Sequence, residues 1–244
     1  MSPTTPATPL TVVLVHGAFA DASGWNGVVQ RLQADGVPVI APSNPLRGIA
    51  HDSAYTKSLL EQTPGRILAV GHSYGGAVIS NAATGNETVV GLVFVSGFAP
   101  DDGEILGQVE ATSKDSVLNQ ALVPLQYPTG PGAQTATEFV IDPVQFHDAF
   151  AADLPEHETA LMAATQRPAA EAAFAEPSGP PAWKTLPCWA VVATGDKAAG
   201  SDVLRSMAVR AGADLTEIEG SHVIMMSQPD VVTDVIRKAI ATLG

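Results

Sequence analysis

The amino-acid sequence predicts an α/β fold, with a mostly parallel sheet of about six strands flanked by helices. Short apolar runs alternate with longer amphipathic stretches along most of the chain, the pattern of strands joined by helical crossovers. The apolar runs are nearly continuous rather than alternating, as in strands that are buried on both faces. One long stretch, between Pro100 and Pro187, breaks the alternation and predicts an insertion.

The first apolar run, at 11–15, is rich in β-branched residues and lies between a Pro-rich segment and His16-Gly17. The runs that predict strands are 11–15, 37–41, 67–70, 89–95, 188–193 and, more weakly, 214–218. The patterns that predict helices are 25–34, 53–62, 74–83, 203–211 and 229–243. The last helix is expected to have Pro229 in its first turn, where the missing N–H costs nothing. Strands that alternate with helices imply right-handed crossovers and helices on both faces of the sheet.

The predicted insertion, residues 101–186, is rich in proline and glycine and contains helical patterns at 143–150 and 156–166. We expect it to form a mainly helical cap over the carboxyl end of the sheet, where ligands bind in such folds. The expected division is a flexible tail at 1–10, a core of 11–100 and 187–244, and the cap at 101–186.

Composition excludes several classes of protein. The chain has 244 residues, of which 45% are hydrophobic and 15% charged, as in a folded globular protein. Its formal net charge of −13 argues against a basic surface that would bind nucleic acid or an anionic membrane. Cys188 is the single cysteine, so neither an intrachain disulfide nor a cysteine-based metal site is expected. No apolar run approaches a membrane span and the first ten residues lack signal-peptide features, so we expect a cytoplasmic protein.

One motif predicts the chemistry. Gly71-His72-Ser73-Tyr74-Gly75-Gly76 directly follows the third predicted strand and begins a helical pattern. Gly-x-Ser-x-Gly between a strand and a helix is the nucleophile elbow, a tight turn that lifts a serine hydroxyl clear of the sheet. A random Gly-x-Ser-x-Gly is expected roughly 0.1 times in such a chain, so the strand and helix on either side carry the argument.

A serine nucleophile needs a general base, and the base needs an acid that orients it. The chain order in this architecture is serine, acid, histidine, which favours His222, in the loop before the last helix, over the other five histidines. Asp196 follows the fifth predicted strand, 26 residues before His222, and is the preferred acid. Asp101 and Asp102, after the fourth strand, are the rivals, although charge at the start of an insertion is also expected for solvation alone.

Two backbone N–H groups must face the negative charge of the transition state. Tyr74, directly after the serine, is expected to supply one, and Ala18, in the loop after the first strand, the other. His16 is predicted to have a structural role, with hydrogen bonds to this loop, rather than to act in catalysis. The predicted lining of an apolar substrate pocket is Phe19, Phe98, Leu125, Tyr127, Phe139, Met162 and Trp183.

These segments together resemble the α/β-hydrolase superfamily. The segments that carry the resemblance are His16-Gly17-Ala18-Phe19 with Trp25, the Ser73 motif, Thr194-Gly195-Asp196 and Gly220-Ser221-His222. The short loops are similar to the compact branch that contains plant methyl esterases, hydroxynitrile lyases and bacterial carboxylesterases. The resemblance implies that Ser73, Asp196 and His222 form a catalytic triad, with Ala18 and Tyr74 as the oxyanion hole.

The chain departs from that branch at two places. Many bacterial members carry an Ile-Pro pair after the acid, where this chain has Ala198-Ala199-Gly200-Ser201. The plant lyases have threonine in place of Gly17 and lysine in place of Val223, which argues against cyanohydrin cleavage.

We therefore expect a serine hydrolase that cleaves a small, largely apolar carboxylic ester and needs no cofactor or metal. Dehalogenases and epoxide hydrolases of this fold carry an aspartate at the elbow, so Ser73 excludes them. The alternatives are a lyase or another non-hydrolytic enzyme of this fold, and a ligand-binding protein on the same scaffold.

Overall fold

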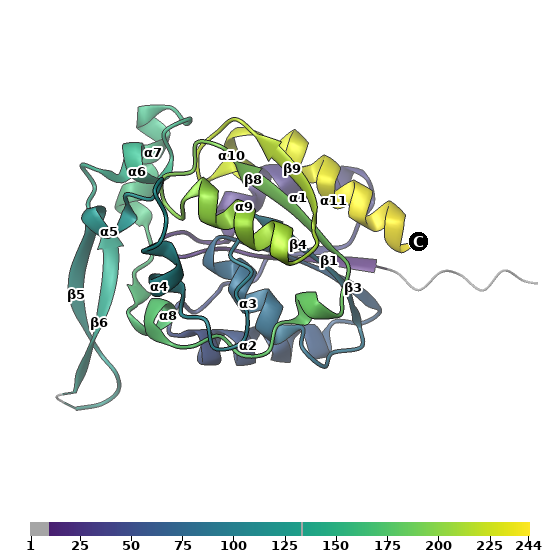
Figure 1. Ribbon diagram of the computed structural model, residues 1–244, viewed down its shortest axis with the longest axis horizontal. Helices are drawn as coiled ribbons and strands as arrows, with labels where there is room; N and C mark the ends of the chain where they lie inside the picture. Colours follow the sequence, from purple (N-terminus) through teal and green to yellow (C-terminus); the bar gives the residue numbers. More distant parts are fainter. Residues whose placement is uncertain (1–9, 133) are drawn as a thin grey trace, which may run out of the picture.

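The computed structural model describes residues 10–132 and 134–244. Six parallel strands form the central sheet in the order β2-β1-β3-β4-β8-β9 (Figure 1). Their bounds are β1 Leu10–Val15, β2 Val39–Ile40, β3 Arg66–His72, β4 Val89–Val95, β8 Cys188–Ala193 and β9 Asp214–Ile218. The prediction of a mostly parallel sheet of about six strands is confirmed.

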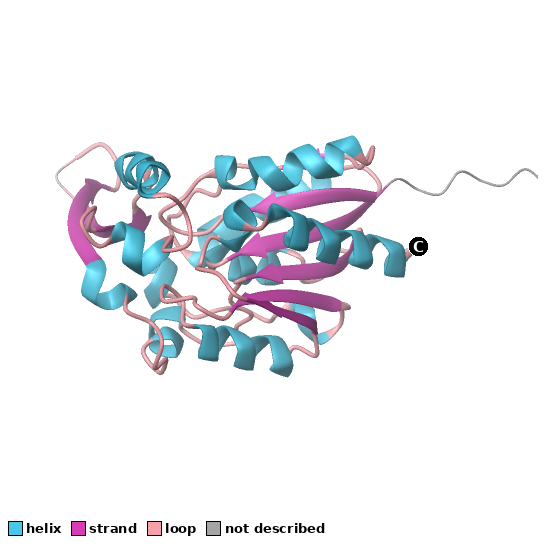
Figure 2. Ribbon diagram, turned by 90° about the horizontal axis from the view of Figure 1, so that it is seen from above, coloured by secondary structure: helices cyan, strands magenta, loops and turns pink. Residues whose placement is uncertain are grey.

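Helices cover both faces of this sheet (Figure 2). They are α1 Asn26–Ala34, preceded by a 3₁₀ turn at Ala22–Trp25, α2 Ile49–Gln62, α3 Tyr74–Ala82, α9 Ser201–Arg210, α10 Ile224–Ser227 and α11 Pro229–Leu243. The chain steps outward from β1 to β2 and then moves back across the sheet to the later strands. Because each crossover is right-handed, this change of direction places α1 on one face and α2, α3 and α9 on the other. Helix α11 packs against α1, and α2 packs against α3.

The core of the molecule lies between these layers. Residues Val12–Val15 of β1 have no solvent exposure, and neither do Leu92 and Val93 of β4. Strands that are covered on both faces need apolar side chains at every position, which explains their nearly continuous apolar runs.

Most of residues 101–186 lie beside the carboxyl ends of the strands, whereas the segment just before β8 runs back along the core and contacts α3 (Figure 1). Their helices are α4 Leu106–Glu110, α5 Leu118–Ala121, α6 Phe146–Phe150, α7 Glu156–Thr165, α8 Ala172–Ala175 and a 3₁₀ turn at Ala182–Lys184. They also include a three-stranded antiparallel sheet of β5 Leu122–Pro128, β6 Thr135–Ile141 and β7 Ala169–Ala170. Helical residues outnumber strand residues here, but the hairpin was not predicted. Its strands contain prolines and threonines, which by local sequence alone predict a loop.

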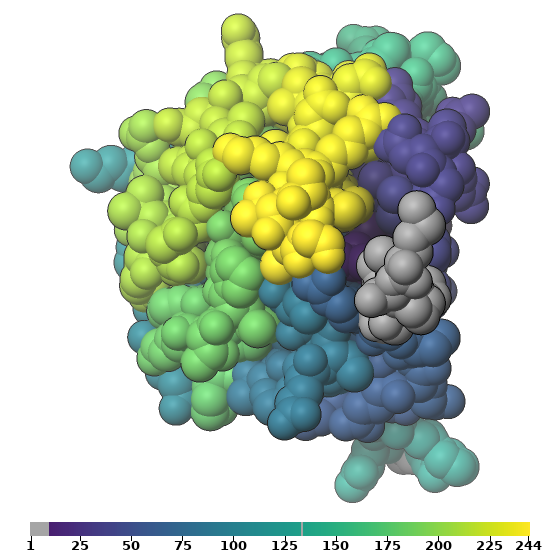
Figure 3. Space-filling model, turned by 90° about the vertical axis from the view of Figure 1, so that its right-hand side faces the viewer, coloured from purple at the N-terminus to yellow at the C-terminus, as the bar shows by residue number. Residues whose placement is uncertain are grey.

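The amino ends of the strands lie at the opposite end of the molecule (Figure 1), where α11, in yellow, forms much of the surface (Figure 3). Residues 1–9 of the predicted tail lie outside the described residues, and Leu10 belongs to β1 rather than to a tail, because it pairs with Arg66 of β3. No helix in residues 10–132 or 134–244 combines the length and the apolar character needed to cross a membrane.

Candidate active site

Ser73 lies alone between β3, which ends at His72, and α3, which begins at Tyr74. Its backbone has φ 52° and ψ −125°, a combination that L-residues rarely adopt and that must be held by its surroundings. Its N–H donates to the carbonyl of Ser96 at 3.2 Å, and its own carbonyl accepts from the N–H of Phe98 at 3.0 Å. The turn is therefore fixed by the loop after β4 as well as by its own helix.

The glycines of the elbow are required by close backbone approach. A Cβ atom on Gly71 would lie 2.5 Å from the carbonyl oxygen of Gly75, and one on Gly75 would lie 2.4 Å from the carbonyl oxygen of Val15. Both distances are too short for any side chain, so α3 can leave the sheet at this angle only with glycine at these positions. These close contacts explain why the Gly-x-Ser-x-Gly pattern has glycine at both positions.

His222 and Asp196 meet in the interior. His222 follows β9 and Asp196 follows β8, which are adjacent strands. The His222 Nδ1 atom lies 2.6 Å from Asp196 Oδ2, and both side chains are almost completely buried. The other carboxylate oxygen, Oδ1, accepts hydrogen bonds at 3.0 Å from the N–H groups of Ala198 and Ala199. Nδ1 therefore carries the proton in the neutral imidazole, and Nε2 is left as an acceptor.

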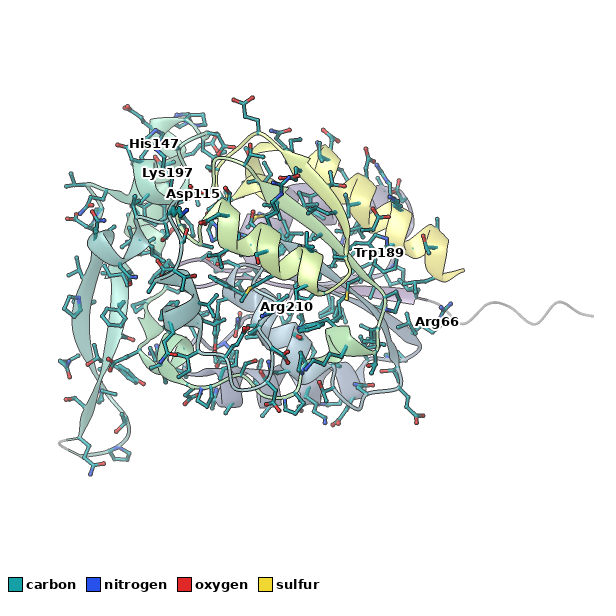
Figure 4. The ribbon with its side chains drawn as sticks, viewed as in Figure 1. Arg66, Asp115, His147, Trp189, Lys197 and Arg210 are labelled. Atoms are coloured by element: carbon teal, nitrogen blue, oxygen red, sulfur yellow. The ribbon has the colours of Figure 1, made fainter. Side chains whose placement is uncertain are left out.

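The rival acids lie elsewhere. Asp101 forms an ion pair with Lys184, and Asp102 is exposed at the start of the insertion. Lys197, the neighbour of Asp196, lies beside Asp115 near the cap (Figure 4), and both residues line one surface cavity. Neither Asp101 nor Lys197 takes part in the pairing of Asp196 with His222.

Two backbone N–H groups next to Ser73 are free to bind an anion. The N–H of Tyr74 is in the first turn of α3, where it has no helical partner, and the N–H of Ala18 has no acceptor within the described part of the chain. The loop that carries Ala18 is pressed against the elbow, since a Cβ on Gly17 would lie 2.7 Å from Ser73 Cβ. Ala18 lines the same cavity as Ser73 and His222.

The Tyr74 ring fixes the start of α3. Its O–H donates at 2.8 Å to Asp52 Oδ2, a fully buried carboxylate that also accepts from the N–H of Arg47. Burial first, and then the negative charge of Asp52, raise the pKa of Tyr74 well above its usual range. Tyr74 is therefore a permanent donor to Asp52, which holds its backbone N–H in position.

Hydrogen bonds of His16 hold the loop that carries Ala18. The N–H of Asn44 donates to His16 Nε2 at 2.8 Å, so Nδ1 carries the proton and donates at 2.8 Å to the carbonyl of Gly17. The carbonyl of His16 accepts from Asn44 Nδ2 at 3.0 Å. This arrangement needs a neutral ring, and burial lowers the pKa of His16.

His72 supports the loop that carries His222. Its Nε2 lies 3.0 Å from the carbonyl oxygen of His222 and donates to it, because a carbonyl can only accept. The two rings lie 4.6 Å apart between their centroids. Burial, reinforced by the neighbouring His222, lowers the pKa of His72 well below the usual value, so His72 is neutral.

Acidification is expected to destabilise the protein between pH 6.5 and 5. His16 and His72 have depressed pKa values in the folded state, so below pH 6.5 the unfolded chain binds more protons than the folded one. These two histidines therefore leave the free energy of unfolding unchanged above pH 6.5. Below it they lower the free energy of unfolding, by at most about 1.4 kcal/mol per pH unit for each histidine. Urea unfolding at several pH values measures this slope.

The His16→Asn variant is the control for this prediction. Asparagine can still donate to the carbonyl of Gly17, and it does not titrate, so its slope between pH 6.5 and 5 should be shallower than that of the natural protein. The carboxylates with lowered pKa values, such as Asp21 and Asp153, act at lower pH. Equal slopes for the two proteins would contradict the assignment to His16.

A carboxylate from the cap also supports the histidine loop. Asp153 Oδ2 accepts from the N–H of Ser221 at 2.9 Å, and Oδ1 accepts from the hydroxyl of the same serine. Ser221 directly precedes His222, so the cap and the loop that carries the histidine are joined at this point. Asp153 was not identified from the sequence, where it is one of many acidic residues in the insertion.

Ser73 and His222 open onto one small apolar cavity. Its volume is about 10 Å³, the room for about one water molecule. The other residues that line this cavity are Ala18, Phe19, Phe98, Leu106, Glu110, Leu118, Phe150, Phe174 and Ala199. The structure thus brings together Ser73, His222 and Ala18 with two of the expected lining residues, Phe19 and Phe98.

Three other expected lining residues lie on the antiparallel hairpin, away from this cavity. Leu125, on β5, is 41% exposed, and Tyr127 stacks its ring beneath the guanidinium of Arg47 at 4.5 Å. Phe139, on β6, packs against the apolar core. None of these three residues is among those that line the cavity at Ser73.

The remaining two expected residues have other surroundings as well. Trp183 is buried and donates its Nε1–H to the carbonyl of Pro100 at 2.9 Å, so it closes the base of the insertion instead of lining the cavity. Met162, on α7, lines a neighbouring cavity with Phe19 and Met225.

Phe150, Phe174 and Glu110 line the cavity but were missed from the sequence. Phe150 lies 5.1 Å from His222 between ring centroids, and Phe174 stacks on Phe19 at 6.0 Å. Apolar residues of an irregular insertion carry no signal that separates those facing the site from those in the insertion's own core. Within residues 10–132 and 134–244, no cluster of three or more metal-ligating side chains occurs. Burial raises the pKa of the Cys188 thiol to about 12, so it is no rival nucleophile.

Comparisons with known proteins agree with this architecture. A family model described as the alpha/beta hydrolase family matches residues 12–235. The solved structure of polyneuridine aldehyde esterase has a TM-score of 0.78 at 21% identity, covering 95% of this chain and 99% of its own. A variant of tomato methylketone synthase I, complexed with β-ketoheptanoate, has a TM-score of 0.78 at 24% identity, covering 97% of this chain and 99% of its own.

A pyrethroid hydrolase from Sphingobium faniae JZ-2 has a TM-score of 0.74 at 20% identity, covering 95% of this chain and 97% of its own. At these identities the likeness establishes the fold. No curated protein sequence matches at a significant level. The resemblance noted in the sequence is confirmed by the family match over most of its length: this chain belongs to the alpha/beta hydrolase family.

Proposed function

We propose that this protein is a serine hydrolase that cleaves a small, largely apolar carboxylic ester through an acyl-enzyme on Ser73. The observation that carries the proposal is the buried pair of His222 and Asp196, 2.6 Å apart, in a cavity shared with the strained Ser73. A neutral imidazole held in this tautomer keeps Nε2 free to accept the serine proton. The names of several similar structures, which are esterases or hydrolases, support the same class of reaction.

The reaction proceeds in two halves. His222 Nε2 accepts the proton of Ser73 as Oγ attacks the ester carbonyl, and the N–H groups of Ala18 and Tyr74 stabilise the oxyanion. The imidazolium then gives its proton to the leaving alcohol as the C–O bond breaks. Water attacks the acyl-enzyme in the second half, with its proton taken by His222, and the carboxylic acid leaves as Ser73 regains its proton. Asp196 stays ionised and stabilises the imidazolium throughout.

The experiment that tests this function is stopped-flow hydrolysis of p-nitrophenyl esters of graded acyl length. We expect a burst of one p-nitrophenolate per active site, followed by steady turnover, with short acyl chains preferred because the cavity is small. Saturable binding without a burst would instead indicate a ligand-binding protein. Turnover of a substrate without uptake of water would indicate a lyase.

The link from the cap to the histidine loop gives a second expectation. Asp153→Ala removes both hydrogen bonds to Ser221 and should lower kcat about fivefold, because a partly exposed charged hydrogen bond contributes about 1 kcal/mol. Asp148→Ala, an exposed carboxylate on the adjacent helix α6, is the matched control and should change little. The same loss of kcat in both variants would show that net charge, rather than the Ser221 contact, matters.

A further inference from the structure

A second cavity lies next to the one that contains Ser73 and His222. It forms where the loop after β1, the end of α7 and the segment that follows His222 come together, and its volume is about 40 Å³. Three of the chain's five methionines, Met162, Met225 and Met226, line it, and we call it the methionine cavity. The other residues that line it are Phe19, Ala20, Asp21, Ser23, Gly24, Thr165, Gln166 and Val223. The mechanism proposed above makes no use of this cavity.

Phe19 lies at the boundary between the two cavities. Among the described residues, it is the one that lines both of them. Its ring stacks on Phe174 with the centroids 6.0 Å apart and meets Phe150 edge-on at 6.4 Å, and both of these residues line the Ser73 cavity. Its backbone has φ 60°, a positive value that bulky residues rarely adopt, so its surroundings must hold it in place. The two cavities therefore adjoin at a single, firmly placed aromatic residue.

The methionine cavity suits an uncharged, apolar group. Two polar side chains of its lining are engaged within the protein, since the amide of Gln166 bonds at both ends to the backbone of Ile141 and the hydroxyl of Thr165 donates to a carbonyl of its own helix. Asp21, the one ionisable residue of the lining, accepts from the N–H of Ser23 at 2.7 Å and would repel an anion. Methionine thioethers are flexible and polarisable, so this lining can adapt to an alkyl or aryl group.

We propose that the methionine cavity binds the alcohol part of the ester, and that Phe19 is the specificity-determining residue that separates it from the acyl part. The inference rests on the proposed function, because it divides the substrate of the same site. Val223, which lines the cavity, directly follows His222, the residue that gives its proton to the leaving alcohol. The cavity therefore adjoins the position at which the alcohol oxygen must lie. The Ser73 cavity, with room for about one water molecule, is too small for both parts of an ester.

A purely structural role would give these methionines other surroundings. Methionines also fill gaps in apolar cores, where neighbouring side chains leave little space between them. Here Met225 is buried, but Met162 and Met226 are partly exposed, and all three surround an open space. This arrangement is typical of an adaptable binding surface.

The test measures binding without turnover and uses two isomeric esters. Butyl acetate carries its butyl group on the alcohol side, and methyl pentanoate carries the same group on the acyl side. In the Ser73→Ala background, ligand-observed NMR titration gives Kd for each ester. We expect butyl acetate to bind about tenfold more tightly, because each methylene that is buried only in the methionine cavity strengthens binding by about fourfold.

Two substitutions in the same background should lower this preference in opposite ways. Met162→Trp fills the cavity from α7 and should weaken butyl acetate by about tenfold without weakening methyl pentanoate. Phe19→Ala joins the two cavities and should strengthen methyl pentanoate, whose chain then reaches the methionine cavity. Leu161→Trp, which adds the same side chain at the exposed neighbour of Met162, is the matched control and should change neither Kd.

Equal binding of the two isomers, or no saturable binding of butyl acetate, would overturn the inference. Equal weakening of both esters by a folded Met162→Trp protein would also overturn it, and Met226→Phe, which fills the cavity from α10, replaces that variant if it unfolds. An unchanged ratio of the two Kd values in Phe19→Ala would refute the role of Phe19. Burst kinetics with p-nitrophenyl acetate and Ser73 intact test the proposed function separately, since the binding preference does not depend on the nucleophile.

Discussion

Replacing Ser73 with alanine is expected to lower the turnover of an activated ester by roughly 10⁴- to 10⁶-fold. The hydroxyl is the atom that forms the acyl-enzyme in the proposed mechanism, and among the residues that line the cavity shared with His222 only Ser73 carries a hydroxyl. The oxyanion N–H groups of Ala18 and Tyr74 would remain, which accounts for the small residual rate. Steady-state kinetics with p-nitrophenyl acetate, together with loss of the burst, measures the effect.

The fold is expected to survive this substitution. Ser73 contributes its backbone N–H and carbonyl to the turn, and alanine keeps both of them. Alanine also adds no atom beyond Cβ, so the contact with Gly17 is unchanged. A thermal unfolding midpoint close to that of the natural protein is the control. Undiminished turnover by a folded Ser73→Ala protein would refute the proposed function.

The Asp196→Asn substitution is expected to lower kcat by about 10⁴-fold, as in a comparable triad. The oxygen that accepts from Ala198 and Ala199 would stay in place, since only an oxygen can accept those two hydrogen bonds. The new NH₂ group would then face His222 Nδ1 and donate to it. The imidazole proton would move to Nε2, which could no longer accept the proton of Ser73.

Asp101→Asn and Asp102→Asn are the matched controls for Asp196→Asn. Asp101 pairs with Lys184 and Asp102 is exposed, so each change should leave kcat within about twofold, as surface substitutions usually do. A large loss in either control with an active Asp196→Asn protein would move the acid to the end of β4. The thermal midpoint of Asp196→Asn separates a loss of the tautomer from a loss of folding.

The regular part of the fold followed from local patterns. The bounds predicted for β4, β8 and α11 agree with the structure at every residue, because strands buried on both faces and a strongly amphipathic helix have clear apolar patterns. The bounds of the edge strand β9 agree as well, although its pattern was weaker and none of its residues is buried. The elbow at Ser73 was equally clear, because a close backbone turn admits only small residues at fixed spacing. These constraints act between residues that are near one another in the chain.

The sequence by itself determined the sheet, its helices and the elbow, whereas the tertiary structure decided which side chains surround Ser73. The pairing of His222 with Asp196 depends on adjacent strands, and strand order limited the choice of acid without fixing it. The lining of the cavity depends on how an irregular insertion folds back, which no local period encodes. For that reason Leu125 lies away from the cavity, while Glu110, with no pattern of its own, lies inside it.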